Sequence, residues 1–168
     1  MVKVTGGSNQ RVSLAALIAV KPGHRPRLIY RVRKDRRRRT DQRKGFTEAD
    51  YARLLDQAHQ QLTGPVVVVW DNLNTHTSAA MDELVAARDW LTVFRLPSYA
   101  HELNPVEPVW SHLKRSLANL VKRNLAELTA LVKTRLRRMQ YRTGLLEGFL
   151  ASTRLDLTPF LTPVIEDV

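Results

Sequence analysis

The sequence contains no cysteine, no apolar run long enough to cross a membrane and few acidic residues for its number of basic ones. Without cysteine, disulfides, thiolate zinc sites and cysteine nucleophiles are excluded, so any metal ion must bind oxygen or imidazole. No run of about 18 apolar residues occurs and no apolar signal segment opens the sequence, which predicts a cytoplasmic protein. A Gly-x-x-x-x-Gly-Lys loop is also lacking, so nucleotide hydrolysis is not supported.

What the sequence has in excess is positive charge. It carries 27 Lys and Arg against 16 Asp and Glu, a formal net charge of +11. Such a surplus suits a polyanionic partner, above all nucleic acid, although ribosomal contact or an acidic membrane face would also fit. The length of 168 residues accommodates one domain, so we interpret residues 1–168 as a single unit.

The first half of the chain predicts an antiparallel hairpin. Residues 13–20 are apolar on both alternating faces, as in a strand covered on both sides, and residues 27–33 alternate apolar and basic side chains. The Lys21-Pro22-Gly23 sequence predicts the turn between them. The second strand has one basic face, so we place it near a sheet edge. Residues 33–44 have no apolar anchor and predict a basic loop.

The remainder of the chain predicts alternating helices and strands. Thr47 and Asp50 form the signature of a capping box, with Phe46 positioned to pack on Tyr51. Residues 66–70 are a continuous β-favouring run, typical of a central strand buried on both faces. We then expect a helix at 77–87, a strand at 91–96, helices from Pro105 and from Asn124, and a last short helix at 145–150 within a C-terminal helix and tail over 141–168. This order predicts an α/β fold in which helices flank a mixed sheet.

Two carboxylates stand out by position. Asp71 ends the run 66–70, and Glu107 opens the helix after the next strand. Neighbouring parallel strands bring their C-terminal ends together, which would let the two carboxylates converge. Divalent cations held by carboxylates activate an attacking water or hydroxyl and stabilise the leaving oxygen in phosphodiester cleavage.

The residues around these carboxylates form a specific combination. Asp71-Asn72 with His76 is followed by Pro-Ser-Tyr-Ala at 97–100, Leu-Asn-Pro-Val-Glu at 103–107 and Trp110. This combination resembles the second and third blocks of the DDE superfamily, specifically the mariner-related bacterial insertion-sequence transposases. The spacing agrees, with 35 residues between Asp71 and Glu107. The resemblance continues through 113–114 and 140–142 and covers most of the chain.

The resemblance implies a ribonuclease H-like fold and a transposase catalytic core that cleaves DNA and transfers strands with Mg²⁺ or Mn²⁺ at a two-metal site. Asp71 and Glu107 would be the second and third metal ligands. Asn72, His76 and Asn104 would support them without binding metal. DNA, as transposon ends and target, would be the partner, in the nucleoid of a bacterial cytoplasm.

The sequence departs from the family pattern at three places. His101 stands where such proteins usually have proline, and Pro108 directly follows Glu107. The third departure concerns the first aspartate of the family, which lies on a strand before the hairpin. The acidic residues before Asp71 all fall in the basic loop or the helix after it: Asp35, Asp41, Glu48, Asp50 and Asp56.

We therefore expect the first strand and its aspartate to be missing, with the residues Val2-Lys3-Val4 just downstream of it. The helix-turn-helix region that would bind transposon ends is also missing. By this interpretation the chain is an N-terminally truncated fragment, a decayed copy or one product of a split reading frame, and is inactive alone.

Simpler roles for these residues remain open. Asp71 would then only cap the helix after its strand, and Glu107 would complete a capping box with Asn104. His76 is expected to form hydrogen bonds in its loop rather than to bind metal. Taken one at a time these roles are favoured, and only the combined motif reverses that preference.

Three functions remain as hypotheses. The first is the metal-dependent DNA endonuclease and strand transferase, and the second is a basic transposase remnant that binds DNA or another subunit without catalysis. The third is an unrelated nuclease such as a junction resolvase, which the 103–107 block disfavours. DNA contact is expected from Arg36, Arg37, Arg38 and Arg39 of the basic loop and from Lys114 and Arg115. The protein partner would be a second copy or an upstream transposase fragment.

Overall fold

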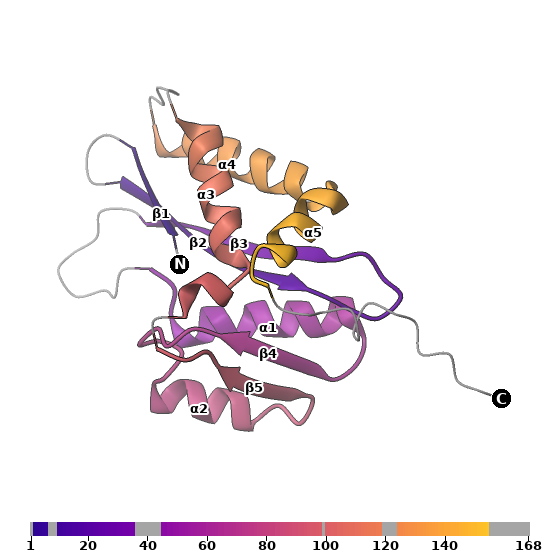
Figure 1. The fold of residues 1–168 in the computed structure, drawn as a ribbon. Helices are drawn as coiled ribbons and strands as arrows, with labels where there is room; N and C mark the ends of the chain where they lie inside the picture. Colours follow the sequence, from indigo (N-terminus) through magenta and orange to yellow (C-terminus); the bar gives the residue numbers. More distant parts are fainter. Residues whose placement is uncertain (1, 7–9, 36–44, 99, 119–123, 155–168) are drawn as a thin grey trace.

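A computed structural model describes residues 2–6, 10–35, 45–98, 100–118 and 124–154 (Figure 1). Strand β2 (Gln10–Ala19) lies between β1 (Val2–Gly6) and β3 (Arg27–Asp35) and pairs antiparallel with both. This arrangement confirms the predicted hairpin and the edge position of its second strand. The expected start of the basic loop at residue 33 is wrong, because β3 pairs with β2 through Asp35. The segment expected just downstream of a missing strand, Val2-Lys3-Val4, is itself part of β1.

The turn between β2 and β3 follows from two residues. The His24 N–H donates to the Lys21 carbonyl at 3.0 Å, and Gly23 has a φ of 70°. A type II turn requires this positive φ at its third residue and favours proline at its second, where Pro22 lies. The local sequence therefore fixes the hairpin register.

The other two strands form a separate parallel sheet. Strand β4 (Val66–Trp70) pairs with β5 (Leu91–Arg95), so the described strands make two sheets in place of the single mixed sheet predicted. The prediction that residues 66–70 are buried on both faces is wrong, because Val67 is 64% exposed and Val69 55%. Only Val66, Val68 and Trp70 are buried, on the face that packs against helices.

Helix α1 (Glu48–Leu62) lies between the two sheets and connects them. The predicted capping box of Thr47 and Asp50 is present, and the Phe46 and Tyr51 rings pack at 5.7 Å. Its apolar side contacts both sheets in one cluster, the α1 core: Ala15, Ile29, Phe46, Tyr51, Leu54, Leu55, Ala58, Val66, Val68, Trp70, Met81 and Leu91. Met81 comes from helix α2 (Ala79–Ala86), which begins at Ser78.

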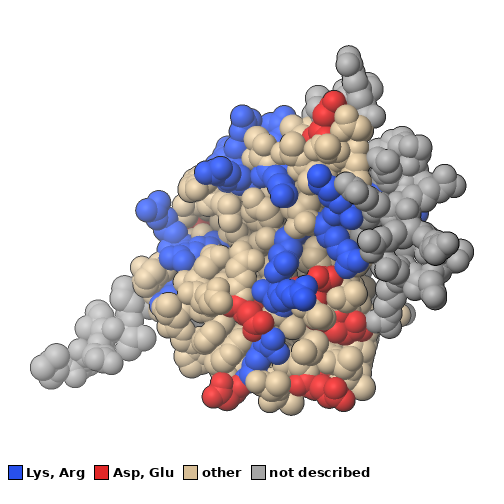
Figure 2. Space-filling model, turned by 180° about the vertical axis from the view of Figure 1, so that it is seen from behind, with Lys and Arg blue, Asp and Glu red and all other residues tan. Residues whose placement is uncertain are grey.

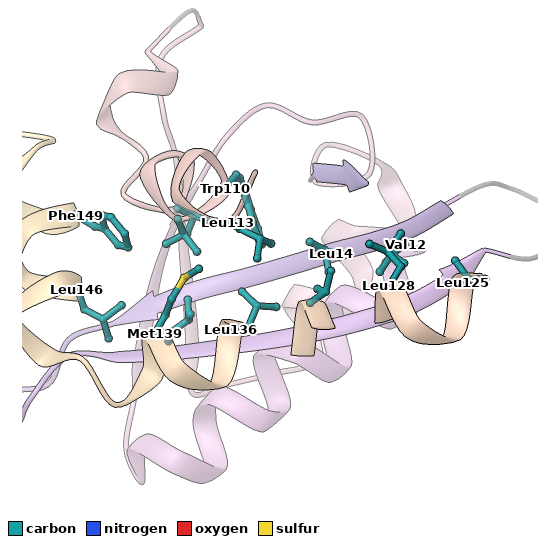
Figure 3. Close-up of a cluster of buried hydrophobic side chains, with 14 residues drawn as sticks. Val12, Leu14, Trp110, Leu113, Leu125, Leu128, Leu136, Met139, Leu146 and Phe149 are labelled. Carbon is teal, nitrogen blue, oxygen red and sulfur yellow. The ribbon is translucent and has the colours of Figure 1, made fainter. Parts of the chain in front are cut away.

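The opposite face of β2 and β3 is covered by three helices, α3 (Val106–Leu117), α4 (Leu125–Gln140) and α5 (Thr143–Ala151). Their apolar sides form a second cluster, the α4 core, in which Leu136 and Met139 of α4 meet Leu113 of α3 and Leu146 of α5 (Figure 3). Because both faces of β2 are covered, its predicted two-sided burial is confirmed.

The helix boundaries agree closely with the expected ones. Asn124 caps α4 by accepting a hydrogen bond from the Glu127 N–H at 2.9 Å. Helix α5 occupies the predicted last helix, while the tail over 155–168 lies outside the described residues. No helix in the described segments is long and apolar enough to span a membrane.

Candidate active site at the end of β4

The C-terminal ends of β4 and β5 lie side by side because the two strands are parallel and in register, with Trp70 opposite Arg95. The pairing continues one step further, since the Leu96 N–H donates to the Trp70 carbonyl at 2.8 Å. The Asn72 side chain then donates to the Leu96 carbonyl at 2.8 Å. Asn72 therefore holds the segment after β4 against the start of the segment that leads to Glu107.

Asp71 is held in place by two donors. Its Oδ1 accepts a hydrogen bond from His76 Nδ1 at 2.9 Å and one from the Leu73 N–H at 3.3 Å. The hydrogen bond from His76 is the main reason that the pKa of Asp71 lies below its ordinary value, against the opposing effect of burial. Asp71 is therefore a carboxylate at neutral pH, and its side chain is 36% exposed.

His76 lies beneath Asp71 in an aromatic setting. Its ring stacks on Trp70 at 4.5 Å and 9°, and meets Tyr51 edge-on at 4.6 Å and 83°. A carboxylate can only accept, so Nδ1 carries the hydrogen of this pair. The other ring nitrogen, Nε2, is buried and has no hydrogen-bond partner among the described residues. This packing fixes the ring and thereby the direction of the Asp71 side chain.

Glu107 is positioned by the start of α3. The Val106 N–H donates to Asn104 Oδ1 at 3.1 Å, and the Glu107 N–H donates to the Asn104 carbonyl at 3.0 Å. The partly exposed Glu107 lies in the first turn, where the helix dipole favours a carboxylate. Pro108 is also in this turn, where its missing N–H costs no helical hydrogen bond.

The two capping roles considered for these carboxylates are not observed. The helix after β4 is capped by Ser78, which lies seven positions beyond Asp71. At α3, the residue at the N-cap position is Pro105, and the side chain of Asn104 accepts its hydrogen bond from the Val106 N–H instead of from the Glu107 N–H. Helix capping therefore does not explain why carboxylates occupy positions 71 and 107.

The side chains at this site determine whether it can hold a metal ion. Within the described segments there is no group of three or more His, Asp or Glu side chains able to hold a metal ion. Asp71 is ionised, and carboxylate oxygens are the ligands that Mg²⁺ and Mn²⁺ prefer. Asp71 thus fits a hard cation, while its pairing with Glu107 remains a prediction.

The basic residues that bear on DNA contact fall into three groups. Lys114 and Arg115 are exposed on α3, whereas Arg36, Arg37, Arg38 and Arg39 lie outside the described residues. A third group was not selected from the sequence: the exposed cations of α4, Lys133, Arg137 and Arg138. The sequence feature that could have revealed this group is a 19-residue stretch, from 128 to 146, that contains no acidic residue.

Comparison with known proteins agrees with this geometry. The profile of the DDE superfamily endonuclease family matches residues 6–131. The catalytic domain of Mos1 transposase, solved with Raltegravir and Mg, has a TM-score of 0.53 at 16% identity, covering 90% of this chain and 80% of that one. The same domain with Raltegravir and Mn scores 0.52 at 13% identity, covering 85% and 80%. The catalytic domain of Mos1 mariner transposase scores 0.50 at 14% identity, covering 84% and 81%.

The fold is thus the ribonuclease H-like fold of transposase catalytic domains, as the sequence predicted. More narrowly, the chain belongs to the DDE superfamily endonucleases, whose profile covers most of its length. A search of curated proteins gave no significant match.

Proposed function

We propose that this chain is the catalytic core of a bacterial insertion-sequence transposase, which cleaves DNA and transfers strands with Mg²⁺ or Mn²⁺. The observation that carries the proposal is the Asp71 carboxylate at the end of β4, ionised and oriented by the buried His76. Glu107, at the start of α3, supplies the second carboxylate. A DNA substrate would bring the protein to the nucleoid.

The proposed site divides its tasks among these residues. Asp71 and Glu107 would hold the divalent cation, which would supply positive charge to activate the attacking hydroxyl and stabilise the leaving oxygen. His76 keeps Asp71 ionised and directed, and Asn72 and Asn104 fix the two segments that carry the carboxylates. No covalent nucleophile is needed, in agreement with the lack of cysteine.

We further propose that the site is incomplete and that an upstream transposase fragment completes it with a strand bearing an aspartate. The free edge of β4 supports this, because β4 pairs only with β5 in the described part of the chain. Likewise, β1 pairs with β2 only from Gln10 to Leu14, so residues 15–19 pair with β3 alone. Unpaired strand edges readily accept another strand.

A plasmid-nicking assay with Mg²⁺ and with Mn²⁺ tests both proposals. The chain is compared with a version extended upstream by a strand that carries an aspartate. We expect nicking only by the extended version, since losing a metal ligand weakens both positioning and electrostatic stabilisation. Asp71→Asn and Glu107→Gln should each abolish it, whereas Glu83→Gln, on the exposed side of α2, should not.

Two results would contradict these proposals separately. Robust nicking by the short chain that Asp71→Asn abolishes would refute incompleteness and leave the active site standing. Nicking by the extended version that survives both Asp71→Asn and Glu107→Gln would refute the active site itself.

A non-enzymatic role is the second candidate, because the described residues contain no group of three or more His, Asp or Glu side chains that could hold a metal ion. In that role the chain binds DNA, through the basic loop (Arg36–Arg39), Lys114 and Arg115, or binds another subunit. It predicts DNA binding with no nicking by either version, also on DNA with pre-nicked ends.

A further inference from the structure

The outward face of α4 carries three exposed cations in its last two turns. Lys133, Arg137 and Arg138 are exposed, while the opposite side of the helix is buried in the α4 core. Figure 2 shows Lys and Arg side chains across the upper part of the molecule, with Asp and Glu mostly in the lower part. On the face seen in this view, the positive charge therefore lies mainly over the upper part of the molecule.

Four cations elsewhere in the described part of the chain, Arg33, Arg53, Arg88 and Arg95, form ion pairs. Arg33 contacts Asp50 at 2.7 Å, and Arg88 contacts Asp56 at 2.7 Å. None of the ion pairs between described residues includes a cation of α4. A cluster of like charges without counterions repels itself, and a polyanion would relieve that repulsion.

The spacing of these side chains forms a row. Lys133, Arg137 and Tyr141 are four residues apart, so they follow one another along the helix at about 6 Å intervals. Tyr141, directly after α4, is 76% exposed, an unusual position for an aromatic ring without a partner. The Gln140 side chain donates to the Leu28 carbonyl at 2.7 Å and anchors this end of the row to β3.

A purely structural role accounts for part of this pattern. Arg137 and Arg138 lie in the last turn of α4, where cations stabilise the helix dipole by about 0.3 to 1 kcal/mol. That effect falls off within one turn, so it does not explain Lys133. It also does not explain the exposed Tyr141.

We propose that Lys133, Arg137, Arg138 and Tyr141, the α4 surface, bind the phosphate backbone of DNA, with Tyr141 stacking on an unpaired base at one end. Rows of cations beside an exposed aromatic ring are the common form of a surface that holds a nucleic-acid strand. This inference rests on the proposed function for its choice of DNA, but it needs neither the metal site nor cleavage.

The test measures binding of a 20-nucleotide single strand and of the matching duplex in EDTA, over a range of salt concentrations. The double variant Arg137→Gln/Arg138→Gln should reduce the slope of log affinity against log salt by about 1.4 for the single strand and 1.8 for the duplex. The matched variant Arg25→Gln/Arg53→Gln removes two exposed arginines outside α4 and should leave the slope nearly unchanged.

Two more variants distinguish the effect of charge on DNA binding from the effects of misfolding and of base stacking. Arg137→Lys/Arg138→Lys keeps the charge and should keep the slope. Tyr141→Ala should weaken single-strand binding at least about fivefold without changing the slope. Equal slope changes in both Gln variants would overturn the α4 surface, as would full affinity in the Tyr141→Ala variant. Because EDTA removes the metal, these results are independent of any failure to cleave DNA.

Discussion

The two halves of the molecule differ in how well their apolar side chains are buried and in how well their cations are paired with acids. In the half built from β1–β3 and helices α3–α5, the apolar surfaces close over one another, while the cations of α4 lack counterions among the described residues. In the half built from β4, β5, α1 and α2, the cations are paired, while the outer face of the sheet exposes Val67, Val69 and Phe94. Asp71 and His76 of the candidate active site follow β4 in this second half, whereas Glu107 lies at the start of α3 in the first.

This difference indicates which surface suits which kind of partner. Cations without counterions, on a half whose apolar side chains are already buried, attract a polyanion, and the protein does not need to change shape to bind it. An apolar face beside a free strand edge suits another polypeptide, because that partner can bury the exposed apolar side chains and form hydrogen bonds with the backbone of the edge strand. Three substitution experiments probe this comparison, from the largest expected effect to the smallest.

The largest effect is expected in the closed core. Leu136→Ala removes a side chain that is 0% exposed in the α4 core and should lower the free energy of unfolding by about 2 to 5 kcal/mol. Val69→Ala, on the open face of β4, should cost less than about 1 kcal/mol. Urea unfolding of both variants measures the difference.

The neighbouring Val68, which is 5% exposed, provides the control within the same strand. Val68→Ala should cost clearly more than Val69→Ala. Equal costs for the two would mean that β4 is buried on both faces after all.

An intermediate effect is expected from the paired charges of the β4 half. Arg88 binds both oxygens of Asp56, at 2.7 and 2.9 Å, and this hydrogen bonding is the main reason that the pKa of Asp56 is lowered. Because solvent screens the partly exposed pair, Asp56→Asn should cost only about 0.5 to 1 kcal/mol at pH 7.

The pH dependence of this cost has a definite sign. A carboxyl whose pKa is lowered by folding stabilises the protein above its unfolded pKa of about 3.9, and loses that contribution as pH falls through the folded pKa. The difference between wild type and Asp56→Asn should therefore vanish in acid. Asp89→Asn, at an exposed position on the same side, is the control, and a difference that persists at pH 2 would contradict the prediction.

The smallest effect is expected for the unpaired charges. Arg137→Gln should change the free energy of unfolding by no more than about 0.5 kcal/mol, because the lost dipole interaction and the relieved repulsion oppose each other. Arg88→Gln, which breaks an ion pair, is the comparison. A loss in Arg137→Gln as large as in Arg88→Gln would show that Arg137 has a structural partner.

Several elements could be predicted because their causes lie within a few residues. The Pro22-Gly23 turn and the capping box of Thr47 with Asp50 depend on local backbone geometry, and both are present. The placement of Asp71 after β4 and of Glu107 at the start of α3 was predictable for the same reason. The burial of β4 was not, since five consecutive apolar residues carry no alternation that would reveal an open face.

By itself, then, the sequence determined the secondary structure, the family and the position of the two carboxylates along the chain, because periodicity, capping and motif spacing are local properties. Only the tertiary structure decided how Asp71 is held, since the packing of His76 between Trp70 and Tyr51 joins the end of β4 to α1, some twenty residues earlier in the chain. The tertiary structure also decided which cations have an acidic partner and which do not. Whether an arginine is neutralised depends on the acid that the fold brings across from it, as Asp56 meets Arg88, and that acid can lie anywhere in the chain.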